Sequence, residues 1–234
     1  FNDLCLGKSF VLRKPIPKPV TCPPESTVVA PENLTLLAND ANQVYLPRDE
    51  MVESLQTRHR SVVLAPLGSG KTEMIKKRIG DMLTLNPESR VLIIATRRQQ
   101  ASGWMNFFGG LGFDHYELLK GCLQETPRLI VCLNSLLRIL AAPIDTGFCG
   151  LKPYYLLVLD EVDSLARCLG GSLVENNLAI FETLKLVLKT AKDVVCMDGL
   201  PTEATGLMLK ALGVFDTFHW TVFNRYRLRE VMLV

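Results

Sequence analysis

Residues 61–72 read SVVLAPLGSGKT, and this stretch decides the fold. A short aliphatic run, typical of a buried strand, leads directly into small residues and a Lys-Thr pair. The following segment, Lys71–Leu85, has apolar residues at helical spacing with charged residues on the opposite side. A strand, a glycine-containing loop and a helix in this order predict a phosphate-binding loop over Ala65–Thr72.

The residue types of this loop suit a bound nucleoside triphosphate. Small residues let backbone N–H groups wrap closely around a β-phosphate, and the start of the next helix adds positive potential. We expect Lys71 to bridge the β- and γ-phosphates and the Thr72 hydroxyl to bind Mg²⁺ of an ATP complex. The general pattern begins with Gly, where this chain has Ala65. The expected nucleotide-binding residues are Ala65, Pro66, Leu67, Gly68, Ser69, Gly70, Lys71 and Thr72.

Further apolar runs follow the first one along the chain. They are Val91–Ala95, Leu129–Leu133, Tyr155–Leu159 and Val194–Met197. Nearly continuous hydrophobicity indicates strands that are buried on both faces, as in a parallel sheet. A second helical pattern covers Glu175–Lys189, so helices alternate with strands. The sequence predicts an α/β fold in which helices flank a parallel sheet on both faces.

The first part of the chain differs from the rest. Its prolines crowd together at Pro15, Pro17, Pro19, Pro23 and Pro24, which favours extended chain. We therefore expect a proline-rich arm or linker over 1–57 and one globular domain over 58–234. Because the chain starts with Phe1 rather than Met, we interpret it as a segment of a longer protein.

Composition is that of an ordinary globular protein, with 48% hydrophobic and 21% charged residues. The net charge of +2 neither favours nor excludes nucleic acid as a partner, because a basic face can coexist with acidic surface. The cysteines form no C-x-x-C pair, which argues against structural zinc and favours a reducing, intracellular setting. No apolar run reaches the roughly 18–20 residues of a membrane span, so we expect no membrane partner.

Carboxylates follow the fourth predicted strand, in the order Asp160, Glu161, Val162 and Asp163. The carboxyl ends of parallel strands face the ligand crevice of such folds. We expect Asp160 to hold Mg²⁺ and Glu161 to polarise the attacking water, with Lys71 as the second catalytic residue through its contact with the phosphates. By itself such a cluster is more often a solvated loop or a helix cap. The upstream phosphate loop favours the catalytic interpretation.

Polar residues follow two other predicted strands. Those after 91–95 are Thr96, Arg97, Arg98 and Gln99, and those after 129–133 are Asn134, Ser135 and Arg138. Both sets suit contact with a phosphodiester backbone, although solvated charges and a helix cap are the alternative interpretations. The expected contacts to single-stranded nucleic acid are Thr96, Arg97, Arg98, Asn134 and Ser135.

Two more segments leave alternatives open. Trp104, Phe107 and Phe108 could stack on bases, but their spacing favours the core-facing side of a helix. Met197–Thr202 follows the last predicted strand and is either a plain turn or a loop that links nucleotide state to strand grip.

In this order, the motifs resemble the DEAD/DExH class of superfamily 2 helicases. Motif I falls at 65–72, motif Ia at 96–98, motif Ib at 134–135 and motif II at 160–163. Over about residues 60–225 the phrases LAPLGSGKT, VLIIATRRQ, RLIVCLNSLLRI, YYLLVLDEVDSL and VVCMDGLPT are most similar to the herpesvirus origin-binding protein family. Two departures stand out: Val162-Asp163 replaces a more usual Val-Met, and Met197–Thr202 lacks the Ser-Ala-Thr of mainstream helicases.

The resemblance implies a RecA-like first lobe of an ATP-dependent helicase or translocase for viral DNA replication initiation, placed in the host nucleus. It also implies a second lobe in the same longer chain, which would supply an arginine finger, and a single-stranded partner, with DNA favoured over RNA. Two alternatives remain: a P-loop ATPase of another class, and a nucleotide-binding interaction platform in a replication complex.

Overall fold

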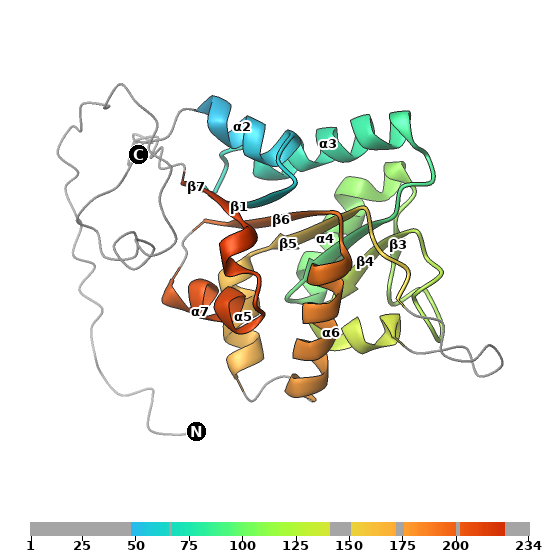
Figure 1. Ribbon diagram of the computed structural model, residues 1–234. Coiled ribbons are helices and arrows are strands. Elements are labelled where there is room, and N and C mark those ends of the chain that lie inside the picture. The colour runs from blue at the N-terminus through green and yellow to red at the C-terminus, as the bar shows by residue number, and fades with distance from the viewer. Residues whose placement is uncertain (1–47, 66, 141–150, 172–175, 200–201, 223–234) are drawn as a thin grey trace, which may run out of the picture.

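The computed structural model describes residues 48–65, 67–140, 151–171, 176–199 and 202–222 (Figure 1). Most of the expected arm, 1–47, and Pro66 of the expected phosphate loop therefore lie outside the described residues. In the described part, seven strands form one fully parallel sheet in the order β3-β4-β2-β5-β6-β1-β7. The prediction of an α/β fold with a parallel sheet is confirmed.

Five of the seven described strands agree closely with the predicted apolar runs, and the strands β3 and β7 match none of them. They are β1 Arg60–Leu64, β2 Val91–Ala95, β3 Asp114–His115, β4 Arg128–Cys132, β5 Leu156–Asp160, β6 Asp193–Asp198 and β7 His219–Val222. Strand β3 has two residues, so it carries no periodicity that a sequence pattern could reveal.

The helices connect these strands. They are α2 Arg48–Gln56, α3 Lys71–Leu85, α4 Arg98–Phe108, α5 Val162–Gly170, α6 Asn177–Thr190 and α7 Glu203–Ala211, with short 3₁₀ turns η2 Gly109–Leu111, η3 Leu133–Ile139 and η4 Phe215–Thr217. Helix α3 has the predicted bounds, and α6 begins two residues later than the predicted 175–189. None of the helices in the described ranges is both long enough and apolar enough to cross a bilayer.

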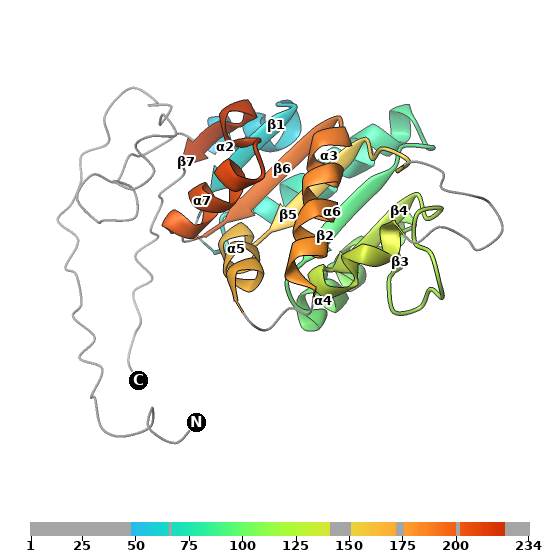
Figure 2. The ribbon, with the colours of Figure 1, turned by 60° about the horizontal axis from the view of Figure 1, so that its bottom comes forward.

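Right-handed crossovers explain why helices cover both faces of the sheet. Helices α3 and α4 connect strands that step towards the β3 edge, whereas η3, α5, α6 and α7 connect strands that step back towards β7. Because crossovers between parallel strands are right-handed, opposite steps place their helices on opposite faces. Figures 1 and 2 show α2 and α3 on one face and α5, α6 and α7 on the other.

The aromatic residues of α4 belong mainly to the core. Trp104 is 5% exposed and Phe108 is fully buried, and their rings stack with centroids 4.9 Å apart. The core-facing interpretation is therefore confirmed for these two residues. Phe107 is half-buried, and the Lys76 ammonium of α3 lies 4.4 Å above its ring. The ring that the core leaves partly exposed is thus in contact with a lysine of α3.

A buried ion pair fastens α3 to the sheet at the edge where the strands begin. Arg78 Nη2 donates to Asp193 Oδ2 at 2.6 Å, and both side chains are 7% exposed. Arg78 Nη1 donates to the carbonyl oxygens of Leu55 and Arg58, at 3.3 and 3.2 Å. On its other oxygen, Asp193 lies 2.7 Å from His59 Nδ1. Because its charge is paired and its hydrogen bonds are made, Arg78 can be buried.

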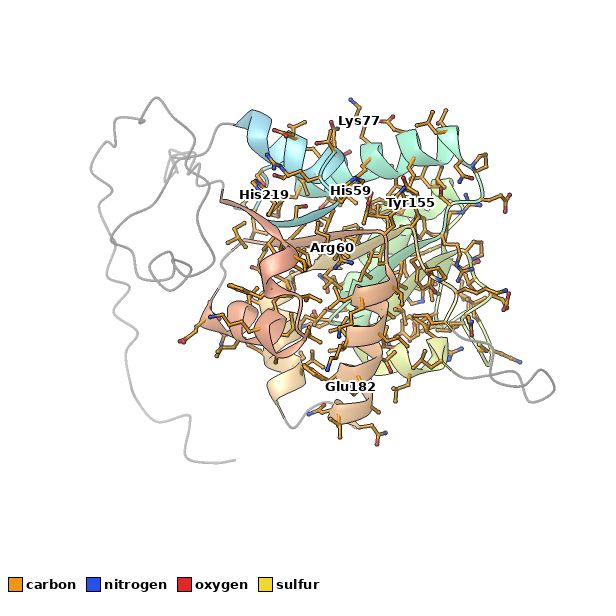
Figure 3. All side chains as sticks on the ribbon, in the orientation of Figure 1. His59, Arg60, Lys77, Tyr155, Glu182 and His219 are labelled. Atoms are coloured by element: carbon orange, nitrogen blue, oxygen red, sulfur yellow. The ribbon has the colours of Figure 1, made fainter. Side chains whose placement is uncertain are left out.

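The same edge joins the end of the expected arm to the domain. Helix α2, which lies within 1–57, packs on α3 and β1, and Ser61 Oγ donates to the Ser54 carbonyl at 3.0 Å. Arg60, labelled in Figure 3 with His59, donates to the carbonyl oxygens of Leu188 and Ala191, both at 3.1 Å. The boundary at 57/58 stays a prediction, but residues 48–56 pack as part of the domain.

Replacing Arg78 with Met should destabilise the protein strongly. Arg78→Met leaves the buried Asp193 carboxylate without its guanidinium, so we expect a loss of about 3 kcal/mol in the free energy of unfolding, measured by urea denaturation. Lys77→Met is the matched control, because Lys77 is exposed on the same helix (Figure 3) and should change stability by less than about 0.5 kcal/mol. Equal effects of the two variants would show that the buried pair contributes nothing.

Candidate functional site

Two glycines give the loop between β1 and α3 its shape. Gly68 has φ 74° and Gly70 has φ 90°, a left-handed backbone that residues with a Cβ rarely adopt. A Cβ at Gly68 would meet nothing within 4 Å, so backbone conformation rather than crowding favours glycine there. Gly70 is also the N-cap residue of α3 and has no side chain to cap it. The first N–H groups of α3 are therefore left for an anion.

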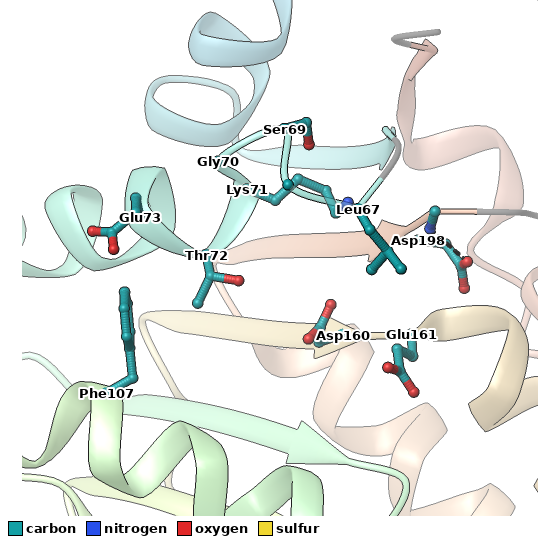
Figure 4. A pocket seen from close by; sticks show the side chains of 12 residues that line it. Leu67, Ser69, Gly70, Lys71, Thr72, Glu73, Phe107, Asp160, Glu161 and Asp198 are labelled. Atoms are coloured by element: carbon teal, nitrogen blue, oxygen red, sulfur yellow. Dashed lines mark hydrogen bonds between the residues drawn. The ribbon is translucent and has the colours of Figure 1, made fainter. Parts of the chain in front are cut away.

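A hollow of about 230 Å³ lies between this loop and the ends of β5 and β6 (Figure 4). The loop and the start of α3 contribute 67–73, the end of β5 and the residue after it contribute Asp160 and Glu161, and the end of β6 and the residue after it contribute Asp198 and Gly199. Strand β6 pairs with both β1 and β5, which explains why segments far apart in sequence meet here. Residues 67–72 of the predicted phosphate loop and the first two carboxylates of the predicted acidic strand end thus line one cavity.

Lys71 turns back across the loop. Its Nζ donates to the Ala65 carbonyl oxygen, the first position of the predicted motif. Burial lowers the pKa of Lys71 from its usual value, while the charges of Asp160 and Asp198 act in the opposite direction. The ammonium is thus held close to two carboxylates at the mouth of the loop. Ser69 Oγ, in contrast, is buried without a hydrogen-bond partner among the described residues.

Asp160 is the most perturbed carboxylate of the cavity. Burial, and then the charge of Glu161, raise its pKa to about 6, against the opposing effects of Lys71 and Gln100. A buried carboxylate of this kind favours a neighbouring cation. Together with the Thr72 hydroxyl it offers hard oxygen ligands, which suit Mg²⁺.

These ligands do not form a closed metal cage. Across the described ranges, no group of three or more His, Cys, Asp or Glu side chains is arranged to hold a metal ion. Mg²⁺ in phosphate-binding sites usually takes one or two protein ligands and completes its shell with phosphates and water. The residues present therefore fit Mg²⁺ that arrives with a nucleotide and do not fit an isolated metal centre.

Glu161 has an unusual backbone. Its φ of 53° and ψ of 52° are left-handed, although it is not a glycine. This conformation costs about 1–2 kcal/mol, and such residues cluster at functional sites. It lets the chain turn directly from β5 into α5, with an exposed Glu161 carboxylate beside Asp160 below the phosphate loop (Figure 4). Helix capping explains neither the strain nor the position, because Glu161 makes no side-chain cap hydrogen bond.

Asp163 joins the acidic strand end to the loop after β6. Its Oδ1 accepts from the Thr202 N–H at 2.8 Å, from the Thr202 hydroxyl at 2.5 Å and from the Thr205 hydroxyl at 3.1 Å. Its Oδ2 accepts from Arg167 Nε at 2.7 Å. Burial alone would raise the pKa of Asp163, but the hydrogen bonds from Arg167 and Thr202 hold it below its usual value.

Asp198 extends this connection to the end of β6. Its Oδ2 accepts from the Asp163 N–H at 2.7 Å, and its Oδ1 accepts from the Gly199 N–H at 2.6 Å. Leu200 and Pro201 lie outside the described residues, but Thr202 also caps α7 through the Ala204 N–H. Asp198 and Thr202 are therefore both bonded to Asp163 of motif II, although the segment 197–202 lacks Ser-Ala-Thr. A role of this segment in linking nucleotide state to strand grip stays a prediction.

The predicted strand-contacting residues lie at the same edge of the sheet. Strands β2 and β4 are neighbours, so Arg97 and Arg98 at the start of α4 come out beside Asn134 and Ser135 in η3. Both arginines and Asn134 are exposed, and Ser135 is half-buried.

Three polar residues at this edge, Arg98 among them, already have partners inside the protein. The buried Thr96 donates from its N–H and its hydroxyl to Gln100 Oε1, at 2.8 and 3.0 Å. Arg98 Nε lies 2.6 Å from Glu117 Oε1 in an exposed ion pair. Arg138 donates to three carbonyl oxygens of the 116–121 segment, so it holds that segment in place. Of the two arginines, only Arg98 is engaged by a carboxylate in the described structure.

Sequence reasoning missed Gln100. Its Nε2 donates to Asp160 Oδ2 at 3.4 Å, while its Oε1 accepts from Thr96. Only the spacing of four residues between Thr96 and Gln100 could have suggested the contact with Thr96. No local pattern suggests the contact with Asp160, because Asp160 lies 60 residues away in the chain.

Known proteins resemble this chain in sequence and in fold. The family described as origin of replication binding protein matches residues 26–212. The replication origin-binding protein of varicella-zoster virus (strain Dumas) is 31% identical over 146 residues, which are 61% of this chain and 16% of that protein. A putative replication origin-binding protein of Acanthamoeba polyphaga mimivirus is 35% identical over 103 residues, which are 43% of this chain and 12% of that protein. The chain thus spans a small part of these relatives.

Solved structures show the same fold. The helicase MrfA bound to DNA and AMPPNP has a TM-score of 0.52 and 13% identity, covering 88% of this chain and 30% of that one. Saccharomyces cerevisiae dbp5, bound to nup159, gle1, IP6 and ADP, has a TM-score of 0.51 and 14% identity, covering 85% and 53%. At this identity the likeness establishes the RecA-like fold alone. The family match spans most of the sequence, and the chain therefore belongs to the origin of replication binding protein family.

Proposed function

We propose that this chain is the first, ATP-binding lobe of a helicase or translocase that acts in the initiation of viral DNA replication. One observation carries the proposal: the phosphate loop and the acidic end of β5 line the same hollow. A nucleotide-binding interaction platform would not need the strained Glu161 beside Asp160. Membership of the family and the DNA-bound helicase with this fold support a nucleic-acid motor over a P-loop ATPase of another class.

The surroundings of the principal residues of the hollow suit the roles that we propose for them in binding and hydrolysing ATP. The backbone around Gly68 and Gly70 wraps phosphates, and Lys71 leaves the Ala65 carbonyl to bind them. Thr72 and Asp160 hold Mg²⁺. Bound Mg·ATP supplies the phosphoryl group for transfer to water, with the metal neutralising charge on the phosphates. Glu161 orients the attacking water and accepts its proton.

The neighbouring loops would contact the nucleic acid. Arg97 and Arg98 after β2, and Asn134 and Ser135 after β4, form one row at the carboxyl edge of the sheet. Guanidinium, amide and hydroxyl groups bind phosphodiester oxygens without reading sequence. The partner we propose is single-stranded DNA, and a second lobe of the same longer protein closes over the strand. That lobe supplies the arginine finger.

In the full-length protein, Lys71→Ala and Glu161→Gln should separate binding from chemistry. Lys71→Ala removes the phosphate-binding ammonium, so Mg·ATP affinity should fall by at least about tenfold. Glu161→Gln keeps the shape and loses the proton acceptor, so turnover should fall by about 10²-fold or more with binding retained. Titration with a nucleotide analogue and a phosphate-release assay measure the two quantities.

The control for this pair is Glu182→Gln, at an exposed position on α6 (Figure 3). It should leave both quantities unchanged. If Glu161→Gln turns over ATP at the parental rate, Glu161 is not the catalytic carboxylate. If Lys71→Ala binds nucleotide with the parental affinity, the assignment of the phosphate loop is wrong.

Replacing Arg97 and Arg98 together with Ala should weaken single-stranded DNA binding by the full-length protein. Binding releases fewer counterions from the DNA for each phosphate contact that is lost. The magnitude of the slope of log affinity against log salt should therefore fall by about 0.7 per contact. Lys189→Ala/Lys192→Ala, at the end of α6 and just before β6, removes the same charge at the opposite edge of the sheet and serves as the control. If the two double variants have the same slope as the parent, these arginines are only solvated.

The link between motif II and the segment after β6 predicts a role for Thr202. Thr202→Val removes the hydroxyl that bonds Asp163, so stimulation of ATP turnover by single-stranded DNA should fall about threefold to tenfold. Thr202→Ser keeps the hydroxyl and should keep the stimulation. Because Thr202 also caps α7, urea denaturation of both variants is measured alongside. A less stable Thr202→Val with full stimulation would show that this threonine only caps the helix.

A further inference from the structure

The amide of Gln100 joins two parts of the site that are otherwise separate. Its Oε1 accepts both polar hydrogens of Thr96, at 2.8 and 3.0 Å, where β2 ends and the strand-contacting row begins. Its Nε2 donates to Asp160 Oδ2 at 3.4 Å, where β5 ends and the hollow begins. One planar group thus spans neighbouring strands of the sheet.

The orientation of this amide follows from its partners. The Thr96 N–H can only donate, so the amide oxygen must face it. The nitrogen then faces Asp160, whose ionised carboxylate can only accept. The reverse orientation would set N–H against N–H and oxygen against oxygen. Both contacts therefore require glutamine at this position.

Thr96 is held so firmly that it can hardly move without changing its hydrogen bonds to Gln100. It is 7% exposed, and the Cys132 thiol of β4 donates to its carbonyl oxygen at 3.4 Å. Thr96 is thus bonded on its N–H side to α4 and on its carbonyl side to β4. Arg97 and Arg98, which follow directly, are exposed at the start of α4. A force on these arginines acts on the same helical turn that carries Gln100.

Local capping explains only half of this geometry. A glutamine near the start of a helix commonly accepts a hydrogen bond from a preceding N–H, and Gln100 does this with Thr96. Capping uses the amide oxygen and makes no demand on the nitrogen. The bond from Nε2 to a carboxylate of another strand is additional. At 3.4 Å it is long enough that a small shift of α4 strengthens or breaks it.

We propose that Gln100 is a positioning residue that couples contact with the nucleic-acid strand at Arg97 and Arg98 to the orientation of the Asp160 carboxylate. This inference rests on the proposed function, because it presumes a strand at α4 and Mg·ATP in the hollow. Movement of the first turn of α4 changes the Gln100–Asp160 bond, which fixes the rotation of the carboxylate. The two ligands consequently change each other's affinity.

The test measures this coupling directly in the full-length protein. Affinity for Mg·AMPPNP is determined with and without a saturating single-stranded oligonucleotide, and the ratio of the two affinities is the coupling factor. Coupling is reciprocal, so oligonucleotide affinity with and without Mg·AMPPNP must give the same factor. We expect Gln100→Glu to reduce the factor about threefold to tenfold towards one.

Gln100→Glu and Gln100→Met are complementary variants, because Gln100→Glu keeps the bond from Thr96 but sets a second negative charge beside Asp160, whereas Gln100→Met adds no charge. The carboxylate still accepts from Thr96 and still caps α4, but it has no N–H to donate to Asp160. Gln100→Met removes both contacts at similar length and should reduce the factor as well, with an added loss of stability. Asn106→Ala, which removes an exposed amide from the same helix, is the control and should keep the parental factor.

The outcomes separate the inference from the function it rests on. A parental factor in both Gln100 variants, with lower stability of Gln100→Met, overturns the inference and leaves Gln100 as a helix cap. A parent protein that binds Mg·AMPPNP and DNA with a factor of one overturns the inference and leaves the proposed function standing. A parent that binds no Mg·AMPPNP contradicts the proposed function itself, before any variant is considered.

Discussion

The central strands are buried on both faces, so polar and charged side chains can stand only at the ends of these strands. The rest of the structure depends on this constraint. Strand β6 shows it most clearly, since all six of its residues are buried and both its terminal residues are aspartates. Asp193 at its start pairs with Arg78 and fastens α3 to the sheet. Asp198 at its end accepts the Asp163 N–H and lines the hollow. Parallel pairing gathers the stabilising contacts at one edge and the ligand-facing groups at the other.

Much of this arrangement could be predicted from sequence because its signals are local. The loop 65–72, the helix after it and the carboxylates 160–161 are each defined by a few consecutive residues. The parallel order of strands then brings them together without further information. What the sequence could not show are contacts between distant segments. Asp163 and Thr202 are 39 residues apart, and Gln100 and Asp160 are 60 apart, so no periodicity or motif connects them.

Residue type also misleads where one side chain has several possible partners. Thr96 and Arg138 suit phosphodiester contact by type, but the structure gives both of them internal hydrogen bonds. Phe107 and Phe108 are adjacent, yet only Phe108 is fully buried. In each case the tertiary environment decides between a surface role and a packing role. Thr202 is a further example, since it bonds Asp163 although the Ser-Ala-Thr tripeptide is absent.

Charge balance in the hollow bears on how the proposed motor completes its site. Lys71 is the single cation among the described lining residues, whereas Glu73, Asp160, Glu161 and Asp198 are anionic. Adding a nucleoside triphosphate to this group concentrates negative charge further, and Mg²⁺ offsets only part of it. During transfer, charge develops on the γ-phosphate oxygens at the open side of the hollow, where this lobe offers carboxylates. On the proposed function, an arginine from a second lobe meets that need, and it can do so only when the lobes close. On this proposal, the acidic surroundings of Lys71 make hydrolysis depend on closure of the two lobes, and a motor needs that dependence if it is to couple turnover to movement along a strand.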